Sequence, residues 1–260
     1  MAWALVTGAT AGIGAAFARE LASRGNDIVL VARDASRLEG VAAELVRDFG
    51  VETEVLPADL SVRDDLDRVA ARLGEQGRPI DVLVNNAGFG VHATLLDEDV
   101  TDHIKAMDVM CLAVLVLGGA AARAMVPRGR GRIITVASLA AWITQGGYSP
   151  VKAYALSYSQ GLSNELHGTG VTATCLCPGW VRTEFHERAG ISTGSIPDVV
   201  WVDAARVARE TVDDAERGKV ISIPTTRWKI ARFLLQHSPD ALVRLVSRVL
   251  TNSRRKNPGE

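Results

Sequence analysis

The stretch Ala2-Trp-Ala-Leu-Val-Thr-Gly-Ala-Thr-Ala-Gly-Ile-Gly14 begins as a short apolar run and continues into three glycines. The run Ala2–Thr7 has the length and composition of a buried strand, and a helical pattern begins at Gly12. Glycines at such a junction let the backbone turn tightly and approach a pyrophosphate, whose charge would meet the helix N-terminus. A tight turn without any ligand needs the same glycines. The stretch therefore predicts the first crossover of an α/β fold, with a dinucleotide as one candidate ligand.

Short apolar runs alternate with helical patterns along the rest of the chain. This alternation implies right-handed crossovers and a parallel sheet covered by helices on both faces. We expect one α/β domain over residues 1–226, a Rossmann-like, doubly wound parallel sheet of about seven strands. The expected strands are Ala2–Thr7, Asp27–Ala32, Glu52–Leu56, Ile80–Asn85, Arg132–Ser138, Val171–Cys177 and Val220–Ile223. The expected helices lie near residues 12–24, 37–49, 62–73, 100–126, 149–167 and 203–216.

Composition narrows the class of protein. The chain has 260 residues, of which 47% are hydrophobic and 23% charged, with a net charge of −1. These values are typical of a globular protein and give no overall attraction to nucleic acid. Three cysteines, Cys111, Cys175 and Cys177, fit reduced thiols in a cytoplasmic protein, and their spacing predicts no metal site. We expect no signal peptide, and no apolar run of the ~20 residues that a membrane span needs.

A tyrosine and a lysine four residues apart form a second motif, Tyr148-Ser-Pro-Val-Lys152. Residues i and i+4 share one face of a helix, so both side chains can point into one cleft. A free tyrosine has a pKa of ~10 and is a poor base, whereas a neighbouring ammonium group favours the phenolate. Pro150 is compatible with the first turn of a helix. The pair alone could be an accident of composition, and its position among the other motifs gives it meaning.

Taken in order, the motifs make the chain resemble the short-chain dehydrogenase/reductase family, in its TGxxxGIG and YxxxK form, from residue 2 to about residue 224. The motifs are Thr7–Gly14, Asn85-Asn-Ala-Gly88, Ser138, Tyr148-x3-Lys152 and Pro178-Gly179. The resemblance implies hydride transfer between nicotinamide and a ketone or secondary alcohol, in a homodimer or homotetramer. It implies that Ser138 orients the carbonyl and that Tyr148 transfers the proton. Lys152 would lower the pKa of the tyrosine and hold the ribose.

The resemblance also implies a nucleotide site. The implied cofactor-binding residues are Gly8, Thr10, Gly12, Ile13, Gly14, Arg33, Arg37, Asp59, Leu60, Asn86, Ala87, Gly88, Tyr148, Lys152, Pro178, Gly179, Val181 and Thr183. Arg33 ends the second expected strand, where the ribose lies in this fold, and an arginine there can bind a 2′-phosphate. We therefore expect NADP(H), with help from Arg37. If Arg33 is only a solvated charge, Asp34 would recognise the ribose and select NAD(H).

The helix expected over residues 100–126 contains the main departure from the family. Relatives usually have an Asp-Val-Asn motif, whose asparagine steadies a proton-relay water beside the lysine. This chain has Asp108-Val109-Met110 instead, and a thioether cannot donate a hydrogen bond and accepts one only weakly. The departure keeps a second hypothesis open, in which the chain is an NADP(H)-binding sensor or scaffold that has lost turnover.

Aromatic residues near the expected substrate site favour an apolar substrate. They are Trp142, Trp180 and Phe185, of which Trp142 could instead pack inside the domain. The stretch from Glu184 to Pro197 is typical of a mobile flap over a substrate, and we expect His186 within it to be exposed.

The pattern changes after residue 226. Residues 227–260 contain eight Lys and Arg against two acidic residues, in short amphipathic stretches broken near Pro239. Such a segment could lie on an anionic membrane. It could also pack on the domain or on a neighbouring subunit, with arginine stems covering apolar surface. We expect a packed helical extension of the 1–226 domain, and not an independent domain.

Overall fold

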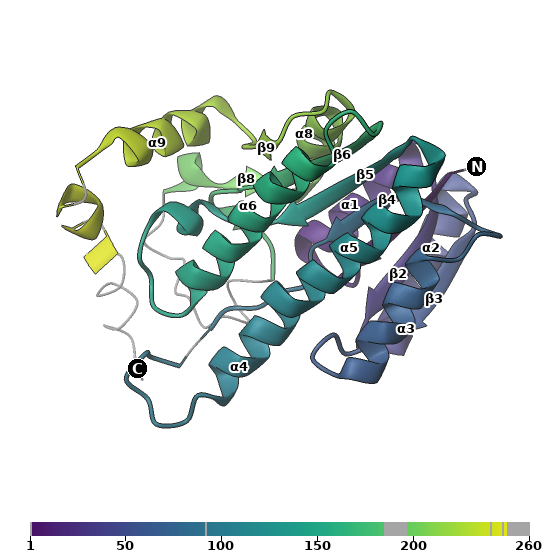
Figure 1. Ribbon diagram of the computed structural model, residues 1–260, viewed down its shortest axis with the longest axis horizontal. Coiled ribbons are helices and arrows are strands. Elements are labelled where there is room, and N and C mark those ends of the chain that lie inside the picture. The colour runs from purple at the N-terminus through teal and green to yellow at the C-terminus, as the bar shows by residue number, and fades with distance from the viewer. Residues whose placement is uncertain (1, 92, 185–196, 240, 246, 249–260) are drawn as a thin grey trace.

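The computed structural model describes residues 2–91, 93–184, 197–239, 241–245 and 247–248. A seven-stranded parallel sheet has the strand order β3-β2-β1-β4-β5-β6-β9, and helices cover both of its faces (Figure 1). The order reverses between β1 and β4, and ligands of doubly wound sheets bind at such a reversal, outside the carboxyl ends of the strands. The predicted Rossmann-like sheet of about seven strands is confirmed.

The strands follow the apolar runs of the sequence to within a residue or two. They are β1 (Trp3–Thr7), β2 (Asp27–Ala32), β3 (Thr53–Pro57), β4 (Ile80–Asn85), β5 (Gly131–Val136), β6 (Val171–Leu176) and β9 (Ile221–Ser222). A second, two-stranded sheet joins β7 (Val181–Arg182) to β8 (Val202–Asp203). The sequence does not predict this small sheet.

The helices divide between the two faces of the large sheet. They are α1 (Gly12–Ser23), α2 (Ala35–Phe49), α3 (Arg63–Leu73), α4 (Thr101–Met107), α5 (Ala113–Met125), α6 (Tyr148–Glu165), α8 (Ala204–Glu216) and α9 (Thr226–His237). Residues of α3, α5 and α6 share one buried cluster, and residues of α1, α2 and α8 share the cluster on the opposite face. A π-helical turn, Asp108–Leu112, joins α4 to α5 where a single α-helix was expected.

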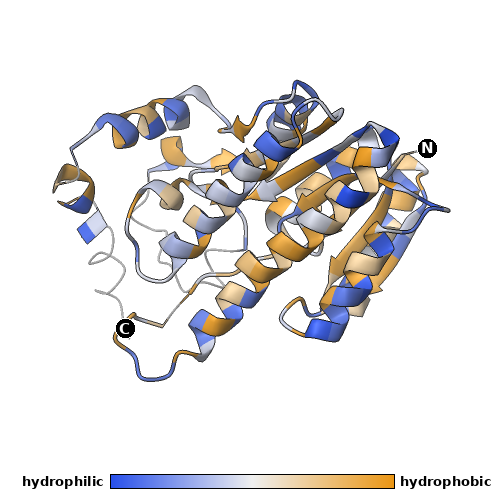
Figure 2. Ribbon diagram, viewed as in Figure 1, coloured by the Kyte–Doolittle hydropathy of each residue, from blue (hydrophilic) through white to orange (hydrophobic). Residues whose placement is uncertain are grey.

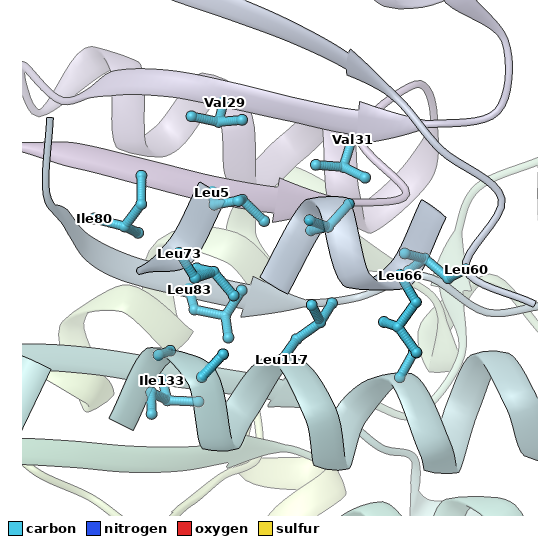
Figure 3. Packing of buried hydrophobic residues seen from close by; sticks show 14 of the residues in the cluster. Leu5, Val29, Val31, Leu60, Leu66, Leu73, Ile80, Leu83, Leu117 and Ile133 are labelled. Carbon is cyan, nitrogen blue, oxygen red and sulfur yellow. The ribbon is translucent and has the colours of Figure 1, made fainter. Parts of the chain in front are cut away.

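The alternation of side chains along the strands builds both clusters. In β1, Leu5 lies in the cluster under α3 and α5, whereas Ala4 and Val6 lie in the cluster under α1 and α2, as the two-residue period of a strand requires. Figure 3 shows Leu5 in the first cluster together with Leu66 of α3 and Leu117 of α5. Apolar side chains therefore cover both faces of the sheet. Polar side chains with a chemical role are expected at the carboxyl ends of its strands.

Residues 101–128 form one continuous helical stretch that is long and apolar enough to cross a membrane. The expectation that no apolar run reaches this length is therefore wrong. Half of its apolar 18-residue window is buried inside the protein, and Val109, Leu117 and Met125 belong to the cluster shown in Figure 3. A core helix meets the same criteria of length and composition as a membrane span, and the buried half has the packing of a core helix.

The chain beyond β9 returns to the domain through α9. Thr225, just before α9, is the one non-glycine residue with a positive φ, 72°, in the described part of the chain. Its backbone N–H donates to Glu210 at 3.1 Å. The ring of Trp228 lies against Gly179, where an added Cβ would overlap the indole. The first turn of α9 is thus packed on the loop that follows β6.

Candidate active site

The glycine turn after β1 leads into α1, whose N-terminus has no side-chain cap among the described residues. Gly8 and Gly12 have φ values of 66° and 56°, which glycine adopts without steric cost. A Cβ on Gly14 would overlap the carbonyl oxygen of Gly8, so the close approach of helix and turn requires the third glycine. Within the described part of the chain, the first turn of this helix also has no acidic residue. The exposed N–H groups there suit the pyrophosphate of a dinucleotide.

Thr7 and Asn86 connect this turn to the end of β4. Thr7 Oγ1 accepts hydrogen bonds from the backbone N–H groups of Asn86 and Ala87 at 2.9 and 3.0 Å. Asn86 Nδ2 donates to the carbonyl of Thr7 at 2.9 Å. The buried Nδ2 of Asn85 has no hydrogen-bond partner within the described residues. Because an orphaned buried donor is rare, this amide fits a site that a polar ligand completes.

The end of β2 lies directly beside the glycine turn. The backbone N–H of Gly8 donates to the carbonyl of Val31 at 2.8 Å, and the exposed Arg33 follows two residues later. The carboxylate of Asp34 accepts from the backbone N–H of Arg37 at 3.0 Å and caps α2. This structural task weighs against Asp34 as the ribose ligand. The guanidinium group of Arg37 forms a 3.4 Å ion pair with Glu184.

Asp59 follows β3 at the same edge. Its carboxylate accepts from the backbone N–H and the hydroxyl of Ser61 at 3.0 and 2.7 Å. Burial acts to raise the pKa of Asp59, but the hydrogen bonds from Ser61 and the charge of Arg33 outweigh burial, so the net pKa is lowered. An ionised carboxylate therefore lies within the field of Arg33.

The other expected cofactor residues also follow the carboxyl ends of strands. They are Thr10 and Ile13 after β1, Leu60 after β3, Ala87 and Gly88 after β4, and Pro178 and Gly179 after β6. Thr183 follows β7, and its Cβ lies 3.2 Å from a Cβ placed on Gly12. Thr183 thus covers the glycine turn, while Val181 is buried in β7.

Ser138 lies two residues beyond β5, because the strand ends at Val136 and not at Ser138 as expected. Its hydroxyl oxygen accepts from the backbone N–H of Ala140 at 3.1 Å and caps the 3₁₀ turn Leu139–Trp142. The hydroxyl proton remains available for donation to another acceptor. The backbone N–H of Leu139 donates to the carbonyl of Pro178 at 3.1 Å, which places Ser138 beside the loop after β6.

Tyr148 begins α6, and Lys152 lies one turn later on the same face, as their spacing predicts. The Nζ atom of Lys152 is 5.6 Å from the centre of the Tyr148 ring and donates to the carbonyl of Val136 at 3.0 Å. Burial lowers the pKa of Lys152 from 10.5 to about 8, although nearby thiols oppose the shift. A buried cation with one backbone partner is thus held beside the phenol.

Met110 is buried in the π-helical turn, close to this lysine. A Cβ placed on Gly88 would lie 3.0 Å from Met110 Sδ and 3.6 Å from Lys152 Nζ. The thioether therefore occupies the neighbourhood of the lysine, where the family usually has an amide. Single π-helical turns are frequent at functional sites, and this one was not predicted because a one-residue insertion leaves the apolar pattern nearly unchanged.

Two of the aromatic residues expected near the substrate are half-buried and pack on other side chains of the protein. Trp142 packs on a buried cluster of residues from β6 and α6, and the guanidinium carbon of Arg232 is 5.5 Å from its ring centre. Trp180 meets Trp201 edge-on, with ring centres 5.6 Å apart. Phe185, His186 and nearly all of the stretch from Glu184 to Pro197 lie outside the described residues.

His103 supports the turn before Tyr148, and sequence analysis did not single it out. Its ring occupies the place where a side chain on Gly147 would lie, and its Nε2 is 3.1 Å from the carbonyl of Thr94. Ser149 Oγ accepts from the backbone N–H of Gln145 at 2.8 Å and orders the same turn. No local sequence signal reveals such a contact, because the two partners lie far apart in the chain.

The described residues include no group of three or more His, Cys, Asp or Glu side chains that could hold a metal ion.

Among curated proteins, a putative ketoacyl reductase of the monensin polyketide synthase from Streptomyces virginiae is 42% identical over 198 residues, or 71% of this chain and 72% of that protein. A very-long-chain 3-oxoacyl-CoA reductase from Anas platyrhynchos is 37% identical over 196 residues. That match covers 70% of this chain but only 61% of the duck protein.

Solved structures resemble the chain over nearly its whole length. A short-chain dehydrogenase from Sphingobium yanoikuyae in complex with NADPH has a TM-score of 0.82 and 33% identity, covering 91% of this chain and 94% of that one. The bulky-bulky ketone specific alcohol dehydrogenase from Comamonas testosteroni has a TM-score of 0.78 and 28% identity, covering 93% and 96%. The family model for short chain dehydrogenases matches residues 2–192. The chain therefore belongs to the short-chain dehydrogenase family, whose members are oxidoreductases that bind a nicotinamide cofactor.

Proposed function

We propose that this oxidoreductase uses NADP(H) to interconvert an apolar ketone and the corresponding secondary alcohol. The observation that carries the proposal is the pair formed by Tyr148 and the buried Lys152 one helical turn apart. Ser138 follows the carboxyl end of β5 and starts a 3₁₀ turn that packs on α6. The relatives named as a ketoacyl reductase and a bulky-ketone alcohol dehydrogenase support a carbonyl substrate.

A nicotinamide bound at this site would supply the hydride to the carbonyl carbon, or accept it in the oxidation. The hydroxyl of Ser138 donates a hydrogen bond to the carbonyl oxygen and stabilises the charge that develops there. The phenol of Tyr148 gives its proton to that oxygen as the alcohol forms, and the phenolate takes the proton back in the oxidation. The ammonium group of Lys152 favours the phenolate because opposite charges attract across a buried space.

The glycine turn and the end of β2 are the proposed binding places for the pyrophosphate and the adenosine ribose of the nucleotide. The uncapped N-terminus of α1 would hold the pyrophosphate. Arg33 is the first residue after β2, the strand whose Val31 carbonyl accepts from Gly8, and it would pair with a 2′-phosphate. The capping role of Asp34 and the NADPH bound to the Sphingobium relative support NADP(H) over NAD(H).

Met110 favours a second candidate function, in which the chain binds NADP(H) as a sensor or scaffold without turnover. Its thioether lies close to Gly88 and Lys152 and cannot steady a water as an amide does. The proposal of catalysis requires that water reach Lys152 through other polar atoms. We favour catalysis because Ser138, Tyr148 and Lys152 are all retained.

The two candidates differ in their dependence on Tyr148. NADPH oxidation should be followed with a panel of apolar ketones and aldehydes, and alcohol oxidation with NADP⁺. We expect turnover that is lost in Tyr148→Phe and retained in Tyr154→Phe, a matched control on the same helix. NADPH binding without Tyr148-dependent turnover in either direction would contradict the catalytic proposal and support the sensor.

Members of the family commonly assemble into oligomers, and we propose that a second copy covers the outer face of α4 and α5. The helical stretch that contains α4 and α5 is largely hydrophobic (Figure 2). Part of its apolar surface is exposed, namely Ile104, Met107, Leu112 and Leu115. An exposed apolar stripe of this length is typical of an interface between subunits.

The free thiols of Cys111, Cys175 and Cys177 support the proposal of a cytoplasmic protein.

A further inference from the structure

The extension after β9 has two faces with different surroundings. On the inner face of α9, Trp228 packs on Gly179, and Arg232 lies over Trp142. Beyond α9, residues 241–245 and 247–248 are helical. There the hydroxyl oxygen of the buried Ser247 accepts from the backbone N–H of Thr144 at 3.0 Å. The inner face therefore packs on the loop between Ser138 and Tyr148.

The outer face of the extension is apolar and exposed. Ile230, Phe233 and Leu234 have 55%, 57% and 59% of their surface exposed, and their spacing places them on one side of α9, opposite Trp228. Leu242 and Leu245 continue the exposed apolar surface with 48% and 56%. These five residues define the outer apolar face. The sequence allowed the extension either to pack on the domain or to lie on a membrane surface. The inner face fits the first interpretation and the outer face fits the second.

The charges of the extension are mostly positive. Residues 227–248 contain Arg227, Lys229, Arg232, Arg244 and Arg248 against one acidic residue, Asp240. A second copy docked through this face about a two-fold axis would bring equal cationic surfaces together, which charge repulsion disfavours. An anionic partner is favoured instead, and apolar residues flanked by Arg and Lys are the pattern of a helix that lies in a lipid interface.

We propose that the outer apolar face binds the surface of an anionic membrane. The exposed Lys229, Arg244 and Arg248 would contact lipid headgroups. Phe233, Leu234 and their neighbours would enter the region between headgroups and acyl chains. Because the inner face touches the loop between Ser138 and Tyr148, binding would bring that loop to the lipid. If the proposed reductase function holds, on which this last step rests, the substrate is a carbonyl compound dissolved in the bilayer.

Vesicle co-sedimentation of the full chain tests the binding directly. We expect the protein to pellet with vesicles of phosphatidylcholine and phosphatidylglycerol, to stay in solution with phosphatidylcholine alone, and to be released by salt. Lys229→Glu should lower the partition coefficient about fivefold or more. Phe233→Asp should lower it about tenfold or more, because it removes buried apolar area and adds a negative charge.

Two exposed residues outside the extension provide matched controls. Arg209→Glu on α8 makes the same charge change as Lys229→Glu, and Val46→Asp on α2 removes an apolar side chain that is 47% exposed. Both should pellet as the wild type does. The proposal is overturned if the wild type stays in solution with phosphatidylglycerol vesicles. It is equally overturned if the controls and the extension variants lose binding alike, or if binding survives in Phe233→Asp.

Turnover distinguishes a failure of this proposal from a failure of the reductase function. With a water-soluble ketone, Phe233→Asp should match the wild type, since the outer face touches no proposed catalytic residue. With a long-chain ketone presented in phosphatidylglycerol vesicles, the turnover rate of Phe233→Asp should fall by the same factor as its partition coefficient for the vesicles. Equal rates on the vesicle-borne ketone would overturn the lipid-substrate step. An inactive wild type that still pellets would refute the reductase function alone.

Discussion

Arg33 is the residue on which the choice of cofactor depends. It follows β2 beside the glycine turn, and its charge helps to lower the pKa of Asp59. If it binds the 2′-phosphate, Arg33→Ala should weaken NADPH binding about tenfold or more, because a hydrogen bond to a charged group contributes about 1.5–3 kcal/mol. Fluorescence titration with NADPH and NADH measures both affinities.

The discrimination between the two nucleotides is the decisive quantity for Arg33. NADH binding should change little in Arg33→Ala, since NADH has no 2′-phosphate. Arg63→Ala, which removes an exposed arginine paired with Asp67 on α3, serves as the control and should leave both affinities unchanged. An equal loss for NADPH and NADH in Arg33→Ala would contradict the assignment.

The buried Lys152 links stability to pH. Its pKa is lowered from 10.5 to about 8 in the folded protein by burial, so below that value both the folded and the unfolded chain hold the proton. Between pH ~8 and ~10.5 the unfolded chain binds more protons, so the free energy of unfolding should rise with pH, by up to about 3 kcal/mol. Urea unfolding of the wild type and Lys152→Met across this range measures the effect. Parallel profiles for the two proteins would show that the shift is absent.

Single residues also show what the sequence could predict of the site. The spacing of Tyr148 and Lys152 predicts a shared helical face because helix geometry is local, and the structure has that face. The spacing could not predict that Trp142 packs on a buried cluster, because that contact depends on partners from other elements. The capping of α2 by Asp34 is a local contact, and an aspartate just before a helix is an ordinary N-cap signal. The catalytic and cofactor roles remain predictions.

The first turn of α1 depends on the absence of a side chain at Gly14. Gly14→Ala would place a Cβ against the backbone of Gly8, and backbone atoms cannot move aside as a flexible side chain does. We expect a loss of nucleotide binding and a lower melting temperature, measured by titration and calorimetry. Gly40→Ala is the matched control in α2, where an added Cβ meets nothing within 4 Å. It should raise stability by roughly 0.5–1 kcal/mol, because glycine is costly inside a helix. A Gly14→Ala protein that behaves like Gly40→Ala would contradict the required close approach.

Among the elements, the long apolar runs were predicted and the short irregular pieces were not. The strands of the large sheet follow from their runs of buried residues, as in Ile28–Val31. The pair of β7 and β8 has only two residues in each strand, too few to show any periodicity. The π-helical turn at Asp108–Leu112 was missed because its residues are as apolar as those of the α-helices around it.

The proposed assembly of the molecule rests on the outer face of α4 and α5. Leu115→Arg should disrupt a subunit interface there, because it would bury an unpaired charge. Val46→Arg on α2 is a matched control, since both side chains are 47% exposed. We expect sedimentation velocity to show a smaller species for Leu115→Arg and an unchanged species for Val46→Arg. A wild-type monomer, or an unchanged Leu115→Arg oligomer, would exclude this face as the interface.

We keep the division into a domain of residues 1–226 and an extension of residues 227–260 as a proposal. The contacts of Trp228 and Ser247 with the domain support an extension that is not independent. A domain boundary is a matter of cooperativity, which sequence periodicity does not report. Partial proteolysis followed by unfolding of the trimmed protein would measure that cooperativity.

The backbone of Thr225 bears on how firmly this extension is held. A threonine at φ 72° is strained, at a cost on the order of 1–3 kcal/mol, and the contacts of α9 with the domain must exceed that cost. Release of α9 would let Thr225 return to an ordinary conformation, so the strain favours the released state. The extension is therefore attached with a smaller free-energy margin than the contact of the half-buried Trp228 with Gly179 suggests.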